Sequence, residues 1–140
     1  MNMRMDKLQA AVLFAKRKYW DNNRGRKRRI HHFYTTELQD IMPLPTPWSA
    51  WYDPYVSVIF PKDPKAVREA LTRADIEFRS HYNTPLHQEE FFHKGTDWEC
   101  PYADSLAGRA ISLPNHFHMT DTDVFKVIRA VKVALNHKDP

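Results

Sequence analysis

The sequence contains a single cysteine and only three glycines in 140 residues. One cysteine can neither form a disulfide within the chain nor build a cysteine-rich zinc site. Few glycines beside ten prolines favour defined turns over flexible linkers. The apolar runs all stay well short of the ~20 residues of a membrane span, and Asp6 and Lys7 interrupt the apolar stretch that a signal peptide needs. We therefore expect a cytoplasmic protein that does not insert into a membrane.

The amino-acid composition is that of one globular domain. Apolar residues make up 42% of the chain and aromatic residues 13%, which is too many for a disordered segment. A length of 140 residues suits a single domain with a modest core. The formal net charge of +4, from 21 Lys and Arg against 17 Asp and Glu, does not by itself require a nucleic-acid partner.

Apolar spacing predicts an alternation of helices and strands. The first half is expected to hold helices over 5–19 and 30–41, either separate or as one long helix bent near Gly25, and a strand over 55–60 between two prolines. The helix over 63–74 has a strong start, with Asp63 as N-cap and Pro64 in the first helical position. The second half is expected to hold strands over 76–80 and 110–114, a short helix from Pro101, and a last helix that begins at Thr120 with a capping box.

These elements predict an α+β fold of two layers, in which a small antiparallel or mixed sheet packs against helices on one side. The apolar stripes that should face this sheet are regular. In the first helix the stripe is Met5, Leu8, Val12, Ala15 and Tyr19, and in the last it is Val124, Val127, Ile128, Val131 and Leu135. We expect residues 1–140 to form one domain.

Residue chemistry suggests two kinds of site, a zinc site and a nucleophilic cysteine. Zinc is suggested by the imidazole, carboxylate and thiol groups of His81, His87, Glu89, Glu90, His93, Cys100, His116 and His118. Their spacing shows none of the patterns that zinc ligands follow, so unrelated surface histidines are the better interpretation and we expect no metal. Cys100 has no identifiable base, which favours a packing role over a nucleophilic one.

The basic run Arg24–Arg29, "RGRKRR", would neutralise phosphates if it were free to bind them. It is one short run without a recognisable nucleic-acid module around it. A solvated helix face is the better interpretation, and a nucleic-acid partner is kept only as the weakest alternative.

Four segments in order give the chain a family resemblance. They are "NMRMDKLQAAV", "DIEFRSHYNTPLH", "CPYADSLAGRAISLPNH" and "MTDTDVFKVIRAV". Together they resemble the C-terminal small domain of DegT/DnrJ/StrS-type aminotransferases, which are pyridoxal-phosphate enzymes that aminate nucleotide-linked keto-sugars. The match is weaker in two places: the segment 31–41 matches the family's helix only at Tyr34 and Leu38, and the stretch before the strand at Tyr55 carries an extra proline.

The resemblance implies the fold of that small domain and the absence of the large domain, which in this family carries the Schiff-base lysine. No lysine of this chain falls where that role could be assigned, so we expect the isolated chain to bind no pyridoxal phosphate and to be inactive alone. The cofactor is expected only in a complex with a large domain.

The resemblance also implies which residues reach ligands. Asn2 matches the family's contact to the cofactor phosphate, and the alternative is that Asn2 caps the first helix. Arg79, His81, Tyr82 and His87 match the loop near the nucleotide-sugar, and the alternative is a proline-stiffened loop packed by Tyr82 and Leu86.

Three interpretations remain open at this point. The chain is the small subunit of a split enzyme whose large subunit is separately encoded, or a non-catalytic pseudo-enzyme that binds or regulates as a homodimer, or a polyanion binder. Exposed apolar surface on the helix from Met5 would favour the first.

Overall fold

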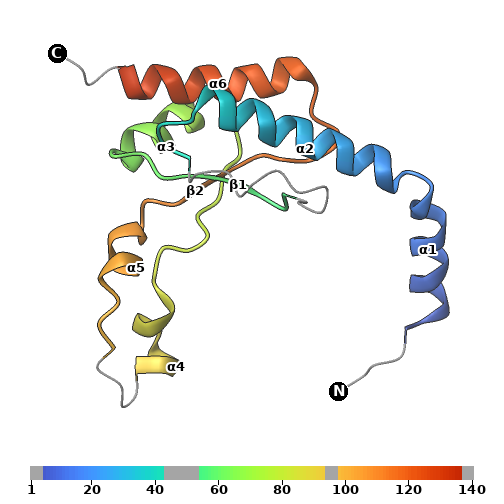
Figure 1. Ribbon diagram of the computed structural model, residues 1–140, viewed down its shortest axis with the longest axis horizontal. Helices are drawn as coiled ribbons and strands as arrows, with labels where there is room; N and C mark the ends of the chain where they lie inside the picture. The colour runs from blue at the N-terminus through green and yellow to red at the C-terminus, as the bar shows by residue number, and fades with distance from the viewer. Residues whose placement is uncertain (1–4, 43–53, 94–97, 137–140) are drawn as a thin grey trace.

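Three helices cover one side of a two-stranded antiparallel sheet (Figure 1). The structure, a computed structural model, describes residues 5–42, 54–93 and 98–136. The helices are α2 (Trp20–Glu37), α3 (Pro64–Arg73) and α6 (Asp121–Asn136), and the strands are β1 (Ser57–Ile59) and β2 (Ile111–Leu113). The predicted two-layer α+β arrangement is confirmed.

The sheet is smaller than the sequence predicts. β1 and β2 pair through Ser57 with Leu113 and Ile59 with Ile111. The expected strand over 76–80 is wrong, because this segment meets β2 at a single bridge between Arg79 and Ser112. The side chains of 76–79 still alternate between inside and outside. Alternation decides which face a side chain takes, but it does not decide how many ladder hydrogen bonds form.

The core lies between α3, α6 and the sheet. α3 and α6 pack side by side, and α6 also contacts α2. The predicted stripe of α6 is buried, with Val124, Val127 and Val131 at most 2% exposed. Opposite it lie Val67 and Leu71 of α3, which are at most 1% exposed. The start of α3 forms as expected, since the Asp63 carboxylate accepts from the Ala66 amide at 3.1 Å and Pro64 follows it.

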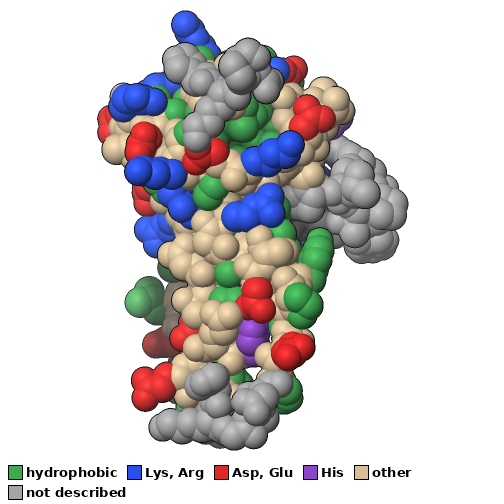
Figure 2. All heavy atoms as spheres, turned by 90° about the vertical axis from the view of Figure 1, so that its left-hand side faces the viewer, with side chains coloured by type: hydrophobic (Ala, Val, Ile, Leu, Met, Phe, Trp, Pro, Cys, Tyr) green, Lys and Arg blue, Asp and Glu red, His purple; other side chains and the backbone are tan. Residues whose placement is uncertain are grey.

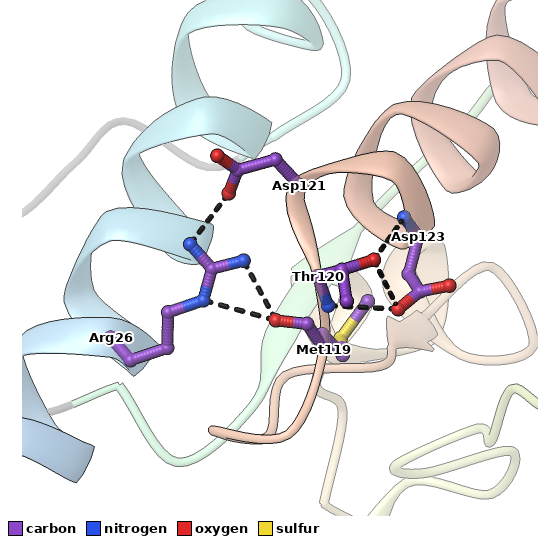
Figure 3. A network of polar contacts seen from close by, with 5 residues as sticks. All are labelled: Arg26, Met119, Thr120, Asp121 and Asp123. Atoms are coloured by element: carbon purple, nitrogen blue, oxygen red, sulfur yellow. Dashed lines mark hydrogen bonds and ion pairs between the residues drawn. The ribbon is translucent and has the colours of Figure 1, made fainter.

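A polar network fixes the start of α6 against α2 (Figure 3). The Thr120 hydroxyl accepts from the Asp123 amide at 3.2 Å, and the Asp123 carboxylate accepts from the Thr120 amide at 2.8 Å. This reciprocal pair confirms the predicted capping box. Arg26 of α2 reaches across to the same turn, where it binds Asp121 and the Met119 carbonyl.

The first two helices are separate, and the break lies elsewhere than expected. α1 (Lys7–Arg17) ends before Lys18 and Tyr19, and α2 begins at Trp20 and runs through Gly25 without a bend. α1 is capped by Asp6, so the alternative that Asn2 caps it is wrong. α1 buries none of its residues. The predicted stripe on this helix therefore exists but has nothing packed on it among the described residues.

A second projection leaves the body at the other end of the molecule. It contains the 3₁₀ helix η1 (Leu86–Gln88), α4 (Glu90–His93) and α5 (Pro101–Leu106). Figure 1 shows α1 and this projection on the same side of the sheet, away from α6. Figure 2 shows Lys and Arg side chains gathered over the helical body and hydrophobic and acidic ones on the projection. Within the described residues, no helix combines the length and apolar character needed to cross a bilayer.

Candidate substrate-binding site

Arg79 and His81 lie along the free edge of β2. The Arg79 amide donates to the Ser112 carbonyl at 3.2 Å, and the Ser112 amide donates to the Arg79 carbonyl at 2.6 Å. Two residues further on, His81 Nδ1 lies 2.8 Å from Ser112 Oγ. Ser112 is 5% exposed, and its backbone makes both hydrogen bonds with Arg79. This fixed residue therefore holds the imidazole of His81 at the edge of the sheet.

These two residues border a pocket of about 370 Å³ between the sheet edge and the start of α6. Its floor is apolar, with Ile76, Leu113 and Val127. Its polar lining residues are Asp75, Glu77, Arg79, His81, His116, Asp123 and Lys126. Hydrogen-bond donors and acceptors around an apolar floor suit a polyhydroxylated or phosphorylated small molecule.

The charges of this pocket are mixed. Hydrogen bonds from the Thr120 amide and hydroxyl lower the pKa of Asp123, and Lys126 adds to this effect. Asp123 therefore stays negative beside Lys126. At the other side of the pocket Glu77 Oε1 lies 3.2 Å from Arg79 Nη2, with both side chains exposed. An exposed pair of this kind is weak, so Arg79 can exchange Glu77 for an anionic ligand.

Tyr82 lies next to His81, is 76% exposed, and is not part of the lining of this pocket. The two rings meet edge to face, with centroids 5.6 Å apart. Leu86 is also exposed, at 66%. The alternative interpretation of this loop, packing by Tyr82 and Leu86, is therefore wrong. The side chains instead offer an aromatic face and a hydroxyl to whatever approaches the loop.

His87 also lies apart from Arg79 and His81. Its Nε2 lies 3.1 Å from Asp104 Oδ1, and its side chain is 12% exposed. The Gln88 amide donates to the same carboxylate at 2.6 Å. His87 thus ties η1 to α5 and lies outside the lining of the pocket. Asn2 lies outside the described residues.

One histidine outside the predicted site, His31, is buried. His31 of α2 is 9% exposed, and its Nδ1 lies 3.0 Å from Ser57 Oγ. The Asn115 amide donates to the same hydroxyl at 3.2 Å. Burial, with a smaller contribution from His32, lowers the pKa of His31. This group links α2 to the sheet and is not accessible to a substrate.

The sequence also suggested a metal site and a phosphate-binding basic run. Across the described ranges, no three His, Cys, Asp or Glu side chains gather as a metal ion requires. In the basic run, Arg26 is committed to Asp121 and the Met119 carbonyl. Lys27 lies over the Tyr55 ring, 5.5 Å from its centroid. Arg26 and Lys27 of this run thus make contacts within the fold.

The comparisons with known proteins place the chain in a family. The profile of the DegT/DnrJ/EryC1/StrS aminotransferase family matches residues 1–132. The chain therefore belongs to this family, and it corresponds to the C-terminal domain of such an aminotransferase.

Individual relatives agree with this assignment. The chain is 33% identical over 139 residues to the erythromycin biosynthesis sensory transduction protein EryC1 of Saccharopolyspora erythraea, covering 94% of the chain and 37% of that protein. It is 27% identical to the dTDP-3-amino-3,6-dideoxy-alpha-D-galactopyranose transaminase of Aneurinibacillus thermoaerophilus, with the same coverage. The chain thus spans little more than a third of the length of these curated relatives.

Solved structures share the fold. A DegT/DnrJ/EryC1/StrS aminotransferase from Brucella abortus superposes with a TM-score of 0.82 at 24% identity, covering 97% of this chain and 37% of that one. DesV of S. venezuelae, solved with a ketimine intermediate, gives a TM-score of 0.80 at 24% identity, covering 94% of this chain and 37% of that one. The small sheet with helices on one side is therefore a fold seen in sugar aminotransferases.

Sequence reasoning missed the roles of two residues, Ser112 at the pocket and Asp104 in the projection beyond it. Ser112 holds His81, and Asp104 holds His87 and Gln88. Both stand within segments quoted for the family resemblance, so their positions were visible. Their partners were not, because each contact joins residues far apart in the chain.

Proposed function

We propose that this chain supplies the C-terminal part of a pyridoxal-phosphate-dependent nucleotide-sugar aminotransferase and completes its site with a separately encoded large subunit. The strongest support is that almost the whole chain matches only a part of a longer relative, while one of its helices is apolar and uncovered. Ninety-four per cent of the chain matches 37% of EryC1, while Leu8 and Phe14 on α1 are exposed by 72% and 77%. An uncovered apolar helix is expected to pack against further polypeptide.

The cofactor of the family is supplied by that further polypeptide. A Schiff-base lysine is activated by a desolvated or cationic surrounding. Among the described residues, Lys126 is the lysine that lines the pocket. It is exposed and lies close enough to Asp123 to lower that carboxyl's pKa. This surrounding of Lys126 does not fit a covalent pyridoxal phosphate site, which supports the proposal that the cofactor lysine lies on the large subunit.

The pocket at the sheet edge contacts the nucleotide-sugar in this proposal. Arg79 donates charge-assisted hydrogen bonds to a diphosphate oxygen. His81, held by Ser112, and the exposed Tyr82 bind sugar hydroxyls. His87 acts indirectly, because its contact with Asp104 positions the segment that follows Tyr82. Asn2 stays a predicted contact to the cofactor phosphate.

The test reconstitutes the enzyme from two polypeptides. The full chain is mixed with the part of the Aneurinibacillus thermoaerophilus transaminase that precedes its matched segment, together with pyridoxal phosphate, a dTDP-linked keto-sugar and glutamate. Release of the 2-oxo acid and formation of the amino-sugar are followed over time. We expect transfer with both polypeptides and none with either alone. Arg79→Ala should lower kcat/KM by ~10- to 100-fold, as loss of a hydrogen bond to a charged group does.

Arg129→Ala is the matched control, since Arg129 is an exposed arginine of α6 outside this pocket, and it should leave the rate unchanged. If the mixture binds the dTDP-sugar but transfers no amino group, the non-catalytic binding module is the correct function. Equal rates for Arg79→Ala and Arg129→Ala would refute the substrate role of this pocket.

A further inference from the structure

α3 and α6 lie together on the side of the sheet that faces away from α1 and from the projection of α4 and α5 (Figure 1). A groove of about 510 Å³ runs between the two helices. Its apolar lining consists of five alanines and one valine, namely Ala66, Ala70, Ala74, Ala130, Ala134 and Val133. Alanine side chains are too short to fill the space between two helices, so the packing of α3 on α6 leaves this surface hollow. We call it the alanine groove.

The polar lining of the alanine groove is mainly cationic. Arg73 of α3 and Lys126 and Arg129 of α6 border it, and Glu69 is the one carboxylate of its described lining. All four side chains are exposed. Arg73 and Arg129 make no hydrogen bond or ion pair with another residue of the described ranges. The groove is therefore positive, and two of its charges are not neutralised there.

The groove has the length and shape that suit a helix. Its lining residues recur on α3 at 66, 70 and 74 and on α6 at 126, 130 and 134, which is the spacing of one face of a helix. Eight residues of helix extend ~12 Å, so the groove follows both helices for more than two turns. Small residues in the floor allow a third helix to approach closely. Apolar side chains on one face of that helix would then lie on the alanines, as in helix-in-groove recognition.

The chain itself offers no suitable occupant among its described helices. α1, α2, α3 and α6 are the described helices of eight residues or more, and each carries more Lys and Arg than Asp and Glu. A second copy that inserted one of them would bring cations onto Arg73 and Arg129, which opposes association. The large subunit of the proposed function is expected at α1, which lies on the other side of the sheet (Figure 1).

We propose that the alanine groove binds an acidic amphipathic helix of another protein. The apolar face of that helix lies on the alanines, and carboxylates beside this face pair with Arg73 and Arg129. These two arginines do not line the pocket at the sheet edge, whereas Lys126 lines both the pocket and the groove. Tests at Arg73 and Arg129 therefore leave the pocket intact, and the proposal does not depend on the proposed function.

A peptide of defined chemistry serves as the probe. It is a helical peptide of about 15 residues, a length at which isolated helices begin to be stable. It carries leucines at positions i, i+4, i+7 and i+11 and glutamates beside them, and a second peptide carries lysine in place of every glutamate. Fluorescence anisotropy of each labelled peptide measures its dissociation constant for the full chain. We expect a Kd of ~10–100 μM for the glutamate peptide, as suits a small interface, and binding at least ~30-fold weaker for the lysine peptide.

Charge reversal tests the two arginines. Arg73→Glu with Arg129→Glu should weaken binding of the glutamate peptide at least ~10-fold, because it sets carboxylates against carboxylates. The same variant should bind the lysine peptide more tightly than the unmodified chain does. Lys7→Glu with Lys18→Glu is the matched control, since it reverses two exposed charges at the ends of α1 and changes the net charge equally. It should leave the binding of both peptides unchanged.

Filling the groove tests its apolar floor. Ala130→Phe places a ring in the groove and should abolish binding of the glutamate peptide. Thr122→Phe adds the same ring at an exposed position of α6 outside the groove and should not. Circular dichroism checks that every variant is folded. Higher salt should weaken binding of the glutamate peptide to the unmodified chain.

The remaining outcomes overturn the proposal. A glutamate peptide that does not bind at ~1 mM, or that binds Ala130→Phe as well as the unmodified chain, rules it out. Equal losses in the groove reversal and in the α1 reversal would show that net charge alone attracts the peptide. If the peptide does not bind but vesicles of phosphatidylcholine and phosphatidylglycerol do, and Ala130→Phe prevents this, the groove is a lipid-binding surface.

Arg129→Ala separates this proposal from the proposed function. It removes one of the two arginines of the groove, so it should weaken binding of the glutamate peptide by ~3- to 10-fold. It should leave amino transfer by the reconstituted enzyme unchanged, because Arg129 does not line the pocket at the sheet edge. Unchanged peptide binding in Arg129→Ala and in the charge reversal would refute the groove and leave the proposed function untouched.

Discussion

Arg26 of α2 and Asp121 of α6 form an ion pair with an Nη1–Oδ1 distance of 2.6 Å (Figure 3). The same guanidinium donates from Nε and Nη2 to the Met119 carbonyl, at 3.1 and 2.7 Å. The arginine side chain is 18% exposed. One side chain thereby connects the middle of α2 to the first turn of α6, next to the capping box that starts this helix.

Arg26→Lys should destabilise the chain by about 1–2 kcal/mol, because lysine keeps the charge but cannot donate two parallel hydrogen bonds to one carbonyl. Urea unfolding followed by circular dichroism measures the free energy of unfolding. Arg129→Lys, on an exposed position of α6, is the control and should change it by less than about 0.5 kcal/mol. Equal stability of the two variants would contradict a structural role for Arg26.

Tyr34→Phe tests the contact between α2 and the end of β2. The Tyr34 hydroxyl donates to the Pro114 carbonyl at 3.0 Å, and the residue is 0% exposed. Removing the hydroxyl leaves a carbonyl without this donor and should cost about 1 kcal/mol of unfolding free energy. Tyr82→Phe removes the same atom from a tyrosine that is 76% exposed and should have almost no effect. The thermal midpoints of the two variants compare them directly.

The parts of the fold that depend on local signals were predictable. Asp63 followed by Pro64, and Thr120 followed by Asp123, start their helices as the sequence predicts, because caps are recognised within one turn. The break at Lys18 and Tyr19 was not predictable, since neither glycine nor proline marks it. Gly25 drew the prediction, yet it continues a helix with open space around it.

The candidate site was also predictable only in part: its residues were, but their contacts were not. The resemblance led to Arg79 and His81 before their geometry was known, and both lie at the edge of β2. The contact of His81 with Ser112 spans 31 positions, and no local pattern encodes it. A second apolar face of α1, with the exposed Leu13 and Phe14, was partly visible in the sequence. Ala10, Leu13 and Phe14 repeat at helical spacing, but only the stripe through Leu8 and Val12 was identified.

The pH dependence of stability should report on His31. Burial lowers the pKa of this histidine from its ordinary value of 6.5, so the unfolded chain binds a proton at a higher pH than the folded chain does. The free energy of unfolding should therefore fall as pH is lowered through about 6.5 and stop falling below the folded pKa. Urea midpoints at about pH 7.5 and about pH 5.5 bracket this transition.

His31→Gln should remove this part of the pH dependence, while His118→Gln, at an exposed histidine, should preserve it. The comparison concerns the slope with pH, so an overall loss of stability in His31→Gln does not affect it. If both variants keep the wild-type slope, the buried imidazole is not the group that titrates.

The projection that contains η1, α4 and α5, called the arm from here on, offers a test of its own internal order. His87 Nε2 and Gln88 Nε2 both contact Asp104 Oδ1, at 3.1 and 2.6 Å, and these contacts join η1 to α5. Asp104→Asn removes the charge that both donors share. Amide hydrogens of residues 86–92 and 101–106 should then exchange ~5- to 30-fold faster, as the loss of a charge-assisted contact in a locally opening segment predicts. Hydrogen exchange followed by mass spectrometry measures this for each segment.

Glu99→Gln is the matched control, because it removes one carboxylate charge from the same arm at an exposed position and should leave the exchange rates unchanged. Helices α3 and α6 should keep their protection against exchange in both variants, since the core between these helices and the sheet does not include the arm. Faster exchange in α6 as well would mean that the arm and the body unfold together. In that case the contacts of Asp104 support the whole domain, and the arm is not an independently opening projection.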